Sequence, residues 1–340
     1  MYRPHRLPFA VLRRGLGVLG ESDTLRQALT SVPLTRAMSR RFVAGETLDD
    51  FVRAARAARE EGLRLTGNFL GEDVTDPEEA CMAAATYLRT LDRLHDEALE
   101  VNVSVKPSQF GADPTDTTVV EHLDRIVSRA RELEGFVRID MESSALTRPT
   151  LELFETLHPG AGEHVGVVLQ AYLKRSAGDV QRMIELGAKV RLCKGAYDES
   201  TEIAYRNPDQ VRESFRELAE RLLADGYQPA IATHDEALLR HVIRYARSQA
   251  ISPDRFEFQM LYGVRRDLQR ALLDRGYRVR VYIPFGVNWY PYLMRRLAER
   301  PENMWFMVRS LVRESPLGGL LPGERGLGNR TAEPDGDGTR

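Results

Sequence analysis

The stretch HVGVVLQAYLKRSAGDVQRMIELGAKVRLCKG (residues 164–195) alternates between strand-like and helix-like patterns. Apolar runs at 164–172 and 188–195 are typical of buried strands, whereas apolar residues at 177–186 recur at helical spacing. Two parallel strands need a crossover connection of this length, and a helix usually supplies it. The stretch therefore predicts a right-handed β-α-β unit.

The same alternation continues in both directions from this unit. Strand-like runs occur at 63–70, 99–106, 136–143, 164–172, 188–195, 229–234, 256–261 and 278–286. Helical patterns occur at 77–94, 118–133, 149–157, 177–186, 209–223, 236–250, 265–275 and 289–300. Eight strand–helix units within roughly 250 residues predict an α/β fold, a closed (β/α)8 TIM-type barrel. A doubly wound open sheet is the structural alternative.

The barrel domain is expected to cover residues 46–314. Residues 1–45 read as an N-terminal helical arm. Glycine, proline and acidic residues crowd into 315–340, a composition that predicts a disordered tail.

Composition argues against several classes of protein. Lys and Arg occupy 48 positions and Asp and Glu 50, so the net charge of −2 gives no reason to expect nucleic-acid binding. The two cysteines, Cys81 and Cys193, suggest no disulfide framework and fit a reducing cytoplasm. The apolar run 9–12 is too short for a signal peptide or a membrane span. We expect a cytoplasmic protein, and peripheral contact with the inner face of the cell membrane stays open.

Polar residues stand where nearly every predicted strand ends, which is where barrels of this type carry their active sites. Lys106, Asp140 and Arg191 follow strands two, three and five and could together bind a carboxylate and set the protonation state of an amine. Singly, each could be a solvated loop residue or part of an ion pair. The full set is Glu72, Lys106, Asp140, Glu142, Gln170, Arg191, Lys194, Gly195, Thr233, His234, Gln259 and Tyr282.

The last predicted helix places Tyr292, Arg295, Arg296 and Glu299 on one face, at i, i+3, i+4 and i+7. One interpretation is a solvated face with a single ion pair. The other is a clamp in which two arginines bind an anionic substrate. The neighbouring tyrosine favours the clamp, because it suits a small ring that bears a carboxylate.

Two other patterns carry little weight. Residues 15–20, GLGVLG, satisfy the G-x-G-x-x-G pattern, but no β-α-β unit surrounds them, so we expect no nucleotide site there. The seven histidines show no metal-ligand spacing, so no metal site is predicted.

The strand ends, together with RLCKGAYDES (191–200), IATHDEALL (231–239), FEFQMLYGV (256–264) and WYPYLMRRLAERPEN (289–303), resemble the proline dehydrogenase family. The resemblance runs from about Arg41 to about Val312. It implies a monofunctional enzyme that oxidises L-proline to Δ1-pyrroline-5-carboxylate by hydride transfer to FAD, the first step of proline catabolism to glutamate. A membrane quinone would then receive the electrons.

The resemblance also implies roles for single residues. Asp140 and Arg191 would be catalytic, and Glu72 would form an ionic gate with Arg295. The implied flavin contacts are Met141, Gln170, Arg191, Lys194, Gly195, Ala196, Thr233, His234 and Glu299. The implied substrate contacts are Lys106, Tyr197, Leu261, Tyr282, Tyr292, Arg295 and Arg296. Cys193 departs from the valine of many relatives, a change between two small apolar side chains that should have little effect.

Two rival functions remain open from the residues alone. A Schiff-base aldolase could use Lys106 or Lys194 as its nucleophile. A barrel-shaped binding or regulatory protein is the rival that is not an enzyme. Whether the chain forms a homo-oligomer is also left open.

Overall fold

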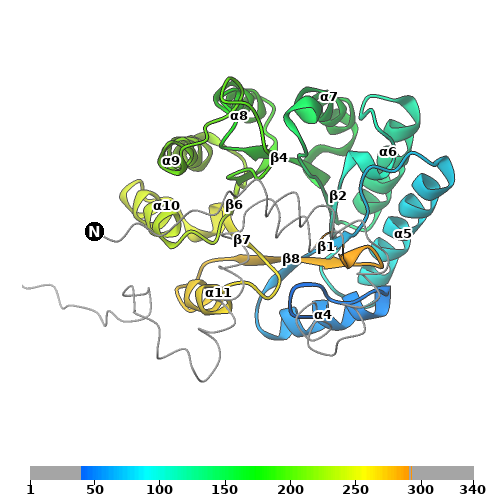
Figure 1. Ribbon diagram of the computed structural model, residues 1–340. Coiled ribbons are helices and arrows are strands. Elements are labelled where there is room, and N and C mark those ends of the chain that lie inside the picture. Colours follow the sequence, from blue (N-terminus) through cyan, green and yellow to red (C-terminus); the bar gives the residue numbers. More distant parts are fainter. Residues whose placement is uncertain (1–39, 291, 293–340) are drawn as a thin grey trace, which may run out of the picture.

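The computed structural model describes residues 40–290 and 292, and these form a closed barrel of parallel strands ringed by helices (Figure 1). The strands follow one another around the barrel in chain order. They are β1 (Arg64–Phe69), β2 (Asn102–Val105), β3 (Phe136–Ile139), β4 (Val165–Gln170), β5 (Lys189–Cys193), β6 (Ala230–Ala232), β7 (Glu257–Leu261) and β8 (Val279–Phe285). The predicted (β/α)8 barrel is thus confirmed.

Closure of the barrel rests on the pairing of its first and last strands. β1 and β8 run parallel in unbroken register, from Arg64 opposite Arg280 to Phe69 opposite Phe285. An open doubly wound sheet would leave both of these strands as edges, so that alternative is excluded. Because all strands are parallel, their carboxyl ends meet at one mouth.

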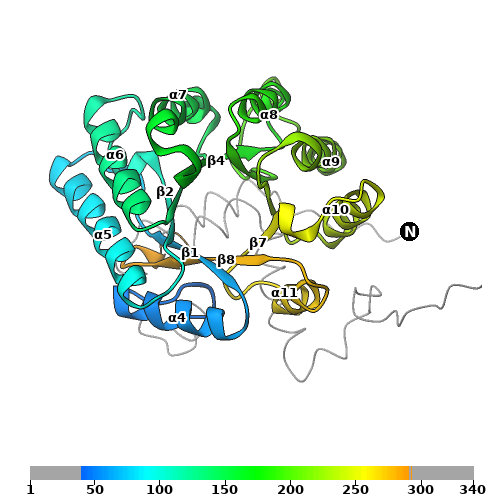
Figure 2. The ribbon, with the colours of Figure 1, turned by 180° about the vertical axis from the view of Figure 1, so that it is seen from behind.

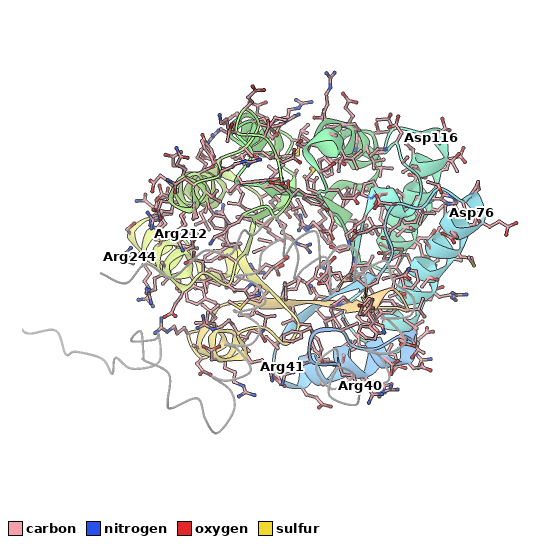
Figure 3. The ribbon with its side chains drawn as sticks, in the orientation of Figure 1. Arg40, Arg41, Asp76, Asp116, Arg212 and Arg244 are labelled. Carbon is pink, nitrogen blue, oxygen red and sulfur yellow. The ribbon has the colours of Figure 1, made fainter. Side chains whose placement is uncertain are left out.

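The helices surround the barrel in both views of the molecule (Figures 1 and 2). They are α4 (Leu48–Glu60), α5 (Pro77–Asp96), α6 (Thr117–Glu132), α7 (Ser144–Ala161), α8 (Ser176–Glu185), α9 (Pro208–Asp225), α10 (Glu236–Ser248) and α11 (Arg266–Leu273). Several starts have a capping side chain: Asp76 accepts from the N–H of Glu78, and Asp116 from that of Thr118. Both aspartates lie at the rim of the molecule (Figure 3).

Helix α7 differs from its predicted start. It begins at Ser144 rather than at Pro149, which lies inside the helix. The sequence pattern predicted a helix over 149–157 only. Pro149 is the sixth residue of α7 and lacks the N–H that would donate to the carbonyl of Ala145, so one hydrogen bond of the ladder is missing there while the helix continues through it.

Helix α4 was not among the predicted crossover helices. It packs against β1 and β8, where Phe51 of α4 stacks on Phe285 with ring centroids 4.8 Å apart. Gly67 of β1 leaves room for this ring, since a Cβ there would lie 2.6 Å from Phe51. A helix that precedes β1 therefore covers the seam at which the barrel closes.

Side chains alternate between the two faces of the sheet. Val103, Val137 and Ile139 are fully buried in the apolar core between barrel and helices. The barrel interior is polar, because Ser104 of β2 and Arg191 of β5 hydrogen-bond although β3 and β4 separate their strands. Polar side chains inside the barrel are therefore hydrogen-bonded to one another just below the mouth where the strands end.

Several predictions fall outside the described residues: the segment 1–39 of the arm, the 15–20 motif, the tail, and most of the last helix, with Arg295, Arg296 and Glu299. Cys81 and Cys193 are both free thiols. None of the described helices is long and apolar enough to span a bilayer.

Candidate active site

A hydrogen-bonded network around Asp140 lies at the carboxyl mouth of the barrel. Arg191 donates to Oδ1 of Asp140 at 2.8 Å, and the Ser104 hydroxyl donates to the same oxygen at 3.1 Å. The phenol of Tyr282 donates to Oδ2 at 2.9 Å. The loop after β3 thus carries a carboxylate held by side chains from β2, β5 and β8.

The two donors from β5 and β8 also contact each other. The Arg191 guanidinium carbon lies 5.4 Å from the centre of the Tyr282 ring, within cation–π range. Burial, together with the negative charge of Asp140, raises the pKa of Tyr282 well above its ordinary value. Tyr282 therefore stays protonated and keeps donating to Asp140.

Lys106 adds a second buried cation to the mouth. Its side chain is only 6% exposed, and Nζ lies 2.9 Å from Oε1 of Glu72. In the sequence, Glu72 was expected to form a gate with Arg295. Arg295 lies outside the described residues, so that gate stays a prediction, while Glu72 contacts Lys106 in the structure.

Hydrogen bonds of Gln109 and Ser108 hold the loop that carries Lys106 in place. Oε1 of Gln109 accepts from the Lys106 N–H at 3.1 Å and from the Tyr87 hydroxyl at 2.8 Å. Ser108 donates to Glu142 from its N–H at 3.1 Å and from its hydroxyl at 2.5 Å. Burial raises the pKa of Glu142, although the Ser108 bonds and Lys106 oppose the shift. The loop after β2 is therefore tied to the loop after β3.

The loop after β5 requires a glycine at position 195. Gly195 has φ +92°, and a Cβ there would lie 2.1 Å from the ring of Tyr172. Both the backbone angle and the close approach exclude larger residues. Gly195 thereby lets the loop pass directly over Tyr172 on its way to Ala196 and Tyr197.

The neighbouring Lys194 is held by a carboxylate from the next strand end. Its Nζ lies 2.6 Å from Oδ2 of Asp235, which also accepts from Nε of Arg212 at 2.9 Å. Burial alone would raise the pKa of Asp235, but the hydrogen bonds and charges of Lys194 and Arg212 outweigh it and lower the pKa to about 2. Asp235 is therefore ionised and anchors both cations.

His234 connects the ends of β6 and β7. Its Nε2 accepts a hydrogen bond from the N–H of Leu261 at 2.9 Å, so this nitrogen carries no proton. Thr233 lies beside it, and its hydroxyl accepts from the N–H of Asp235 at 3.1 Å.

These groups surround one cavity of about 260 Å³, close to the lower end of the ~300–1,000 Å³ range of small-molecule pockets. Most of the residues singled out in the sequence line it: Glu72, Lys106, Asp140, Met141, Gln170, Arg191, Lys194, Gly195, Ala196, Tyr197, His234, Gln259, Leu261, Tyr282 and Tyr292. Thr233 is buried but is not among the lining residues. The structure thus places these residues together, while their individual roles stay predictions.

Some contributors went unnoticed in the sequence. Val168, Ala232 and Met260 line the cavity, but small or apolar residues inside strands carry no signal of their own. Ser104 could have been found, because it lies two positions before Lys106 and alternation places both on the same face. Asp235 could also have been found, because it directly follows the Thr233-His234 strand end.

Two polar atoms on cavity-lining residues indicate what the site accepts. Nε of Arg191 and Oε1 of Gln170 are buried without a hydrogen-bond partner among the described residues. The amide nitrogen of Gln170 is already used, since it donates to the carbonyls of Met141 and Glu142. A buried donor and a buried acceptor suit a planar ligand with both kinds of group, as the flavin ring system has.

Comparison with known proteins identifies one family, that of proline dehydrogenase. The family model for proline dehydrogenase matches residues 51–309. Proline dehydrogenase of Deinococcus radiodurans is 38% identical over 280 residues, which cover 81% of this chain and 90% of that protein. Proline dehydrogenase 1 of Bacillus subtilis strain 168 is 35% identical, with 82% and 92% covered.

A solved structure supports the same fold. Proline utilization A (PutA) from Bdellovibrio bacteriovorus, inactivated by N-propargylglycine, superposes with a TM-score of 0.74 and 26% identity. The match covers 86% of this chain but 35% of that one, so the chain spans about a third of the length of that larger protein.

Proposed function

The chain belongs to the proline dehydrogenase family and is an enzyme of proline catabolism, and from this premise we propose that it oxidises L-proline to Δ1-pyrroline-5-carboxylate by hydride transfer to FAD. The family implies a flavin cofactor, and the proposal specifies FAD. The observation that carries the proposal is the buried network of Asp140, Arg191 and Tyr282 beside the cation of Lys106, all around one cavity.

Lys106 is suited to bind the substrate carboxylate. It is a buried cation whose partner is the Glu72 carboxylate at 2.9 Å, and a substrate carboxylate offers the same chemistry. Arg295 and Arg296 are proposed to complete this grip. Tyr282, Tyr292 and Leu261 line the same cavity and would enclose the apolar ring of proline.

The positive charge of the site favours loss of a proton from the substrate nitrogen. Free proline carries a protonated amine near neutral pH, and neighbouring cations disfavour that charge. Both Asp140 oxygens are occupied by Arg191, Ser104 and Tyr282. Asp140 therefore orients Arg191 and is not a base in this proposal. The amine loses one proton and C5 loses a hydride, which together form the C=N bond of the product.

A bound FAD would supply the two-electron acceptor for that hydride. Arg191 and Gln170 are proposed to contact it through the buried Nε and Oε1 that have no partner in the described part of the chain. The remaining proposed contacts are Met141, Lys194, Gly195, Ala196, Thr233, His234 and Glu299. A quinone is the proposed final electron acceptor, which requires peripheral contact of a cytoplasmic protein with the membrane surface.

The rival Schiff-base chemistry is disfavoured by the partners of both lysines. A nucleophilic lysine must be neutral, and enzymes achieve this by burial away from counter-charges or beside another cation. Lys106 lies 2.9 Å from Glu72, and Lys194 lies 2.6 Å from Asp235. Each contact stabilises the ammonium form and opposes nucleophilic attack.

Product analysis tests the proposal against this rival. The purified enzyme is incubated with L-proline and a water-soluble quinone, and the molecular mass of the product is measured by mass spectrometry. We expect a product lighter than proline by two hydrogens, and FAD in the extract of the denatured protein. Covalent capture of the substrate on Lys106 or Lys194 after borohydride treatment, without a lighter product, would establish the aldolase instead.

A further inference from the structure

A second cavity, of about 500 Å³, lies at the other end of the barrel. It is lined by residues at or next to strand starts, among them Arg64 of β1, Lys189 of β5 and Glu257 of β7. The candidate active site lies at the strand ends, so the two cavities occupy opposite ends of the barrel interior. We call the cavity of the candidate active site the upper cavity and this second one the lower cavity. Arg191 and Gln259 line both, and of the residues of the lower cavity the function proposed above uses only Arg191.

Positive charge exceeds negative charge among the residues that line the lower cavity. Its four carboxylates largely serve other cations: Glu100 and Glu257 pair with Arg280, and Glu163 with Lys189. Six cations line the cavity with these four carboxylates, and one of the six, Arg191, pairs with Asp140 of the candidate active site, so one positive charge is in excess. The cations are Arg64, Arg138, Lys189, Arg191, Arg278 and Arg280, and the fourth carboxylate is Glu134.

Two of these cations, Arg138 and Arg278, form no ion pair within the described residues, and Arg138 is the one that is buried. It is 3% exposed, and its guanidinium donates to two backbone carbonyls, at 3.1 Å to Val167 and also to Lys189. Its Nε is buried with no partner, and no carboxylate within residues 40–290 forms an ion pair with it. A buried charge is normally paired, so Arg138 lacks the anion that such a group requires.

Comparison with Arg280 shows what Arg138 lacks. Both arginines are buried inside the barrel, but Arg280 pairs with two carboxylates, whereas Arg138 pairs with none in the part of the chain that the structure describes. Burial, with the charges of Arg191 and Arg280, lowers the pKa of Arg138 well below its ordinary value. Arginine does not in practice lose its proton in proteins, so the molecule cannot relieve this repulsion by deprotonation.

The position of the guanidinium depends on a glycine in the adjacent strand. A Cβ on Gly166 of β4 would lie 2.5 Å from Nη1 of Arg138 and 2.4 Å from the Lys189 carbonyl oxygen. Any side chain there would therefore displace Arg138. The sequence thus leaves space for a buried guanidinium at this point.

We propose that the lower cavity binds a small oxyanion of the inorganic phosphate or sulfate type through Arg138. The planar fork of arginine matches two oxygens of such an ion, and the surplus positive charge of the cavity attracts it. The bound anion neutralises a buried charge, so it stabilises the barrel end farthest from the candidate active site. This site does not depend on the proposed redox function.

Thermal unfolding of the full-length enzyme tests the proposal. Sodium sulfate is titrated against sodium chloride at matched ionic strength. We expect a saturable rise of the melting temperature with sulfate only, because a ligand that binds the native state stabilises it by mass action. In Arg138→Met the apparent Kd for sulfate should rise at least ~10-fold, the loss of one charge-assisted contact.

Two control variants separate this site from other cationic surfaces. Arg148→Met removes the same charge from a side chain that is 78% exposed, and its response should equal that of the wild type. Lys106→Met removes a cation from the upper cavity, and it should also retain the response. A response that survives Arg138→Met, or that disappears in Lys106→Met, overturns the proposal.

Crystals grown with selenate locate the ion directly and do not depend on the folding of a variant. An anomalous peak within hydrogen-bond distance of the Arg138 guanidinium supports the site. Selenate found only at the protein surface or in the upper cavity shows an adventitious ion only and overturns it.

Discussion

Among single residues, Asp140 connects side chains of three strands at the mouth of the barrel. Its two oxygens accept hydrogen bonds from three side chains that belong to separate strands, and Arg191 is its ion-pair partner at 2.8 Å. A buried ion pair of this kind adds little when complete, but removal of one partner leaves an uncompensated charge. Asp140 therefore supports both the fold of the mouth and the orientation of Arg191.

Replacing Asp140 tests this dual role. Asp140→Ala should reduce the free energy of unfolding by about 3–5 kcal/mol, because Arg191 would be left buried without its partner. Tyr282→Phe removes one hydrogen bond to the carboxylate and keeps the ion pair, so its loss should be about 2 kcal/mol. Urea denaturation measures both. An equal loss in the two variants would show that the ion pair with Arg191 contributes no more than the single hydrogen bond from Tyr282.

Gly195 offers a second test at this scale. Gly195→Ala places a Cβ 2.1 Å from the Tyr172 ring at φ +92°, so the loop that carries Lys194 and Tyr197 must move. We expect the variant to be purified with much less flavin, read from the ratio of visible to ultraviolet absorbance. Gly178→Ala is the matched control, because nothing lies within 4 Å of the added Cβ and alanine suits a helix. Full flavin content in Gly195→Ala would show that this loop does not hold the cofactor.

At the scale of the element, the helix starts show how local signals determine boundaries. Asp76-Pro77 combines a capping carboxylate with a first-turn proline, and α5 begins at Pro77, as predicted. Pro149 carries one of these signals without the capping residue before it, and α7 begins elsewhere. Helix α4 has a full capping box at Thr47 and Asp50. Only the packing of Phe51 on Phe285 shows that it covers the closing strands.

The cap of α5 makes a simple prediction. Asp76→Ala removes the acceptor for the N–H of Glu78 and should lower the free energy of unfolding by about 1 kcal/mol. Asp76→Asn keeps an acceptor oxygen and should restore most of the loss. Chemical denaturation of the three proteins distinguishes the cases, and an unchanged midpoint for Asp76→Ala would contradict the assignment of the cap.

Glu257, the first residue of β7, should contribute free energy of unfolding that is lost in acid. Burial alone would raise the pKa of Glu257, but the charge and hydrogen bonds of Arg280 prevail and lower the pKa to about 2, from an ordinary value near 4.5. A carboxylate whose pKa is lower in the folded state stabilises the protein fully above its unfolded pKa. The contribution, on the order of 3 kcal/mol, is lost as the pH falls from about 4.5 through 2.

Glu257→Gln removes the group that titrates. The difference in free energy of unfolding between wild type and variant should be largest above about pH 5 and should shrink toward pH 2. Urea denaturation at a series of pH values measures it. A difference that is independent of pH across this range would mean that folding does not lower the pKa of Glu257.

At the scale of the whole molecule, the sequence predicted the barrel because eight strand-like runs alternate with helical ones, and this periodicity is local information. It also predicted that Lys106, Asp140 and Arg191 lie together at one mouth of the barrel, and the structure brings them to one cavity, while their roles stay predictions. It could not predict that Glu72 contacts Lys106, or that Asp235 anchors Lys194. These pairs join separate loops, and their distances depend on the closed geometry of the whole barrel.

The sequence also could not predict the cluster of charged side chains that lines the lower cavity. In the sequence, Arg138 appears as a single polar residue in a strand. Only the closed barrel shows that its neighbours Arg191 and Arg280 already have carboxylate partners of their own. The surplus charge is therefore a property of the assembled molecule.

We propose that the upper cavity holds a flavin beside a site for proline, and reduction of the enzyme by proline without oxygen is a decisive test. The purified enzyme is mixed with L-proline without oxygen, and its visible absorption is followed in a stopped-flow instrument. We predict a yellow protein whose flavin band bleaches at a rate that saturates with proline concentration. A colourless protein, or a flavin band that proline leaves unchanged, would contradict the claim.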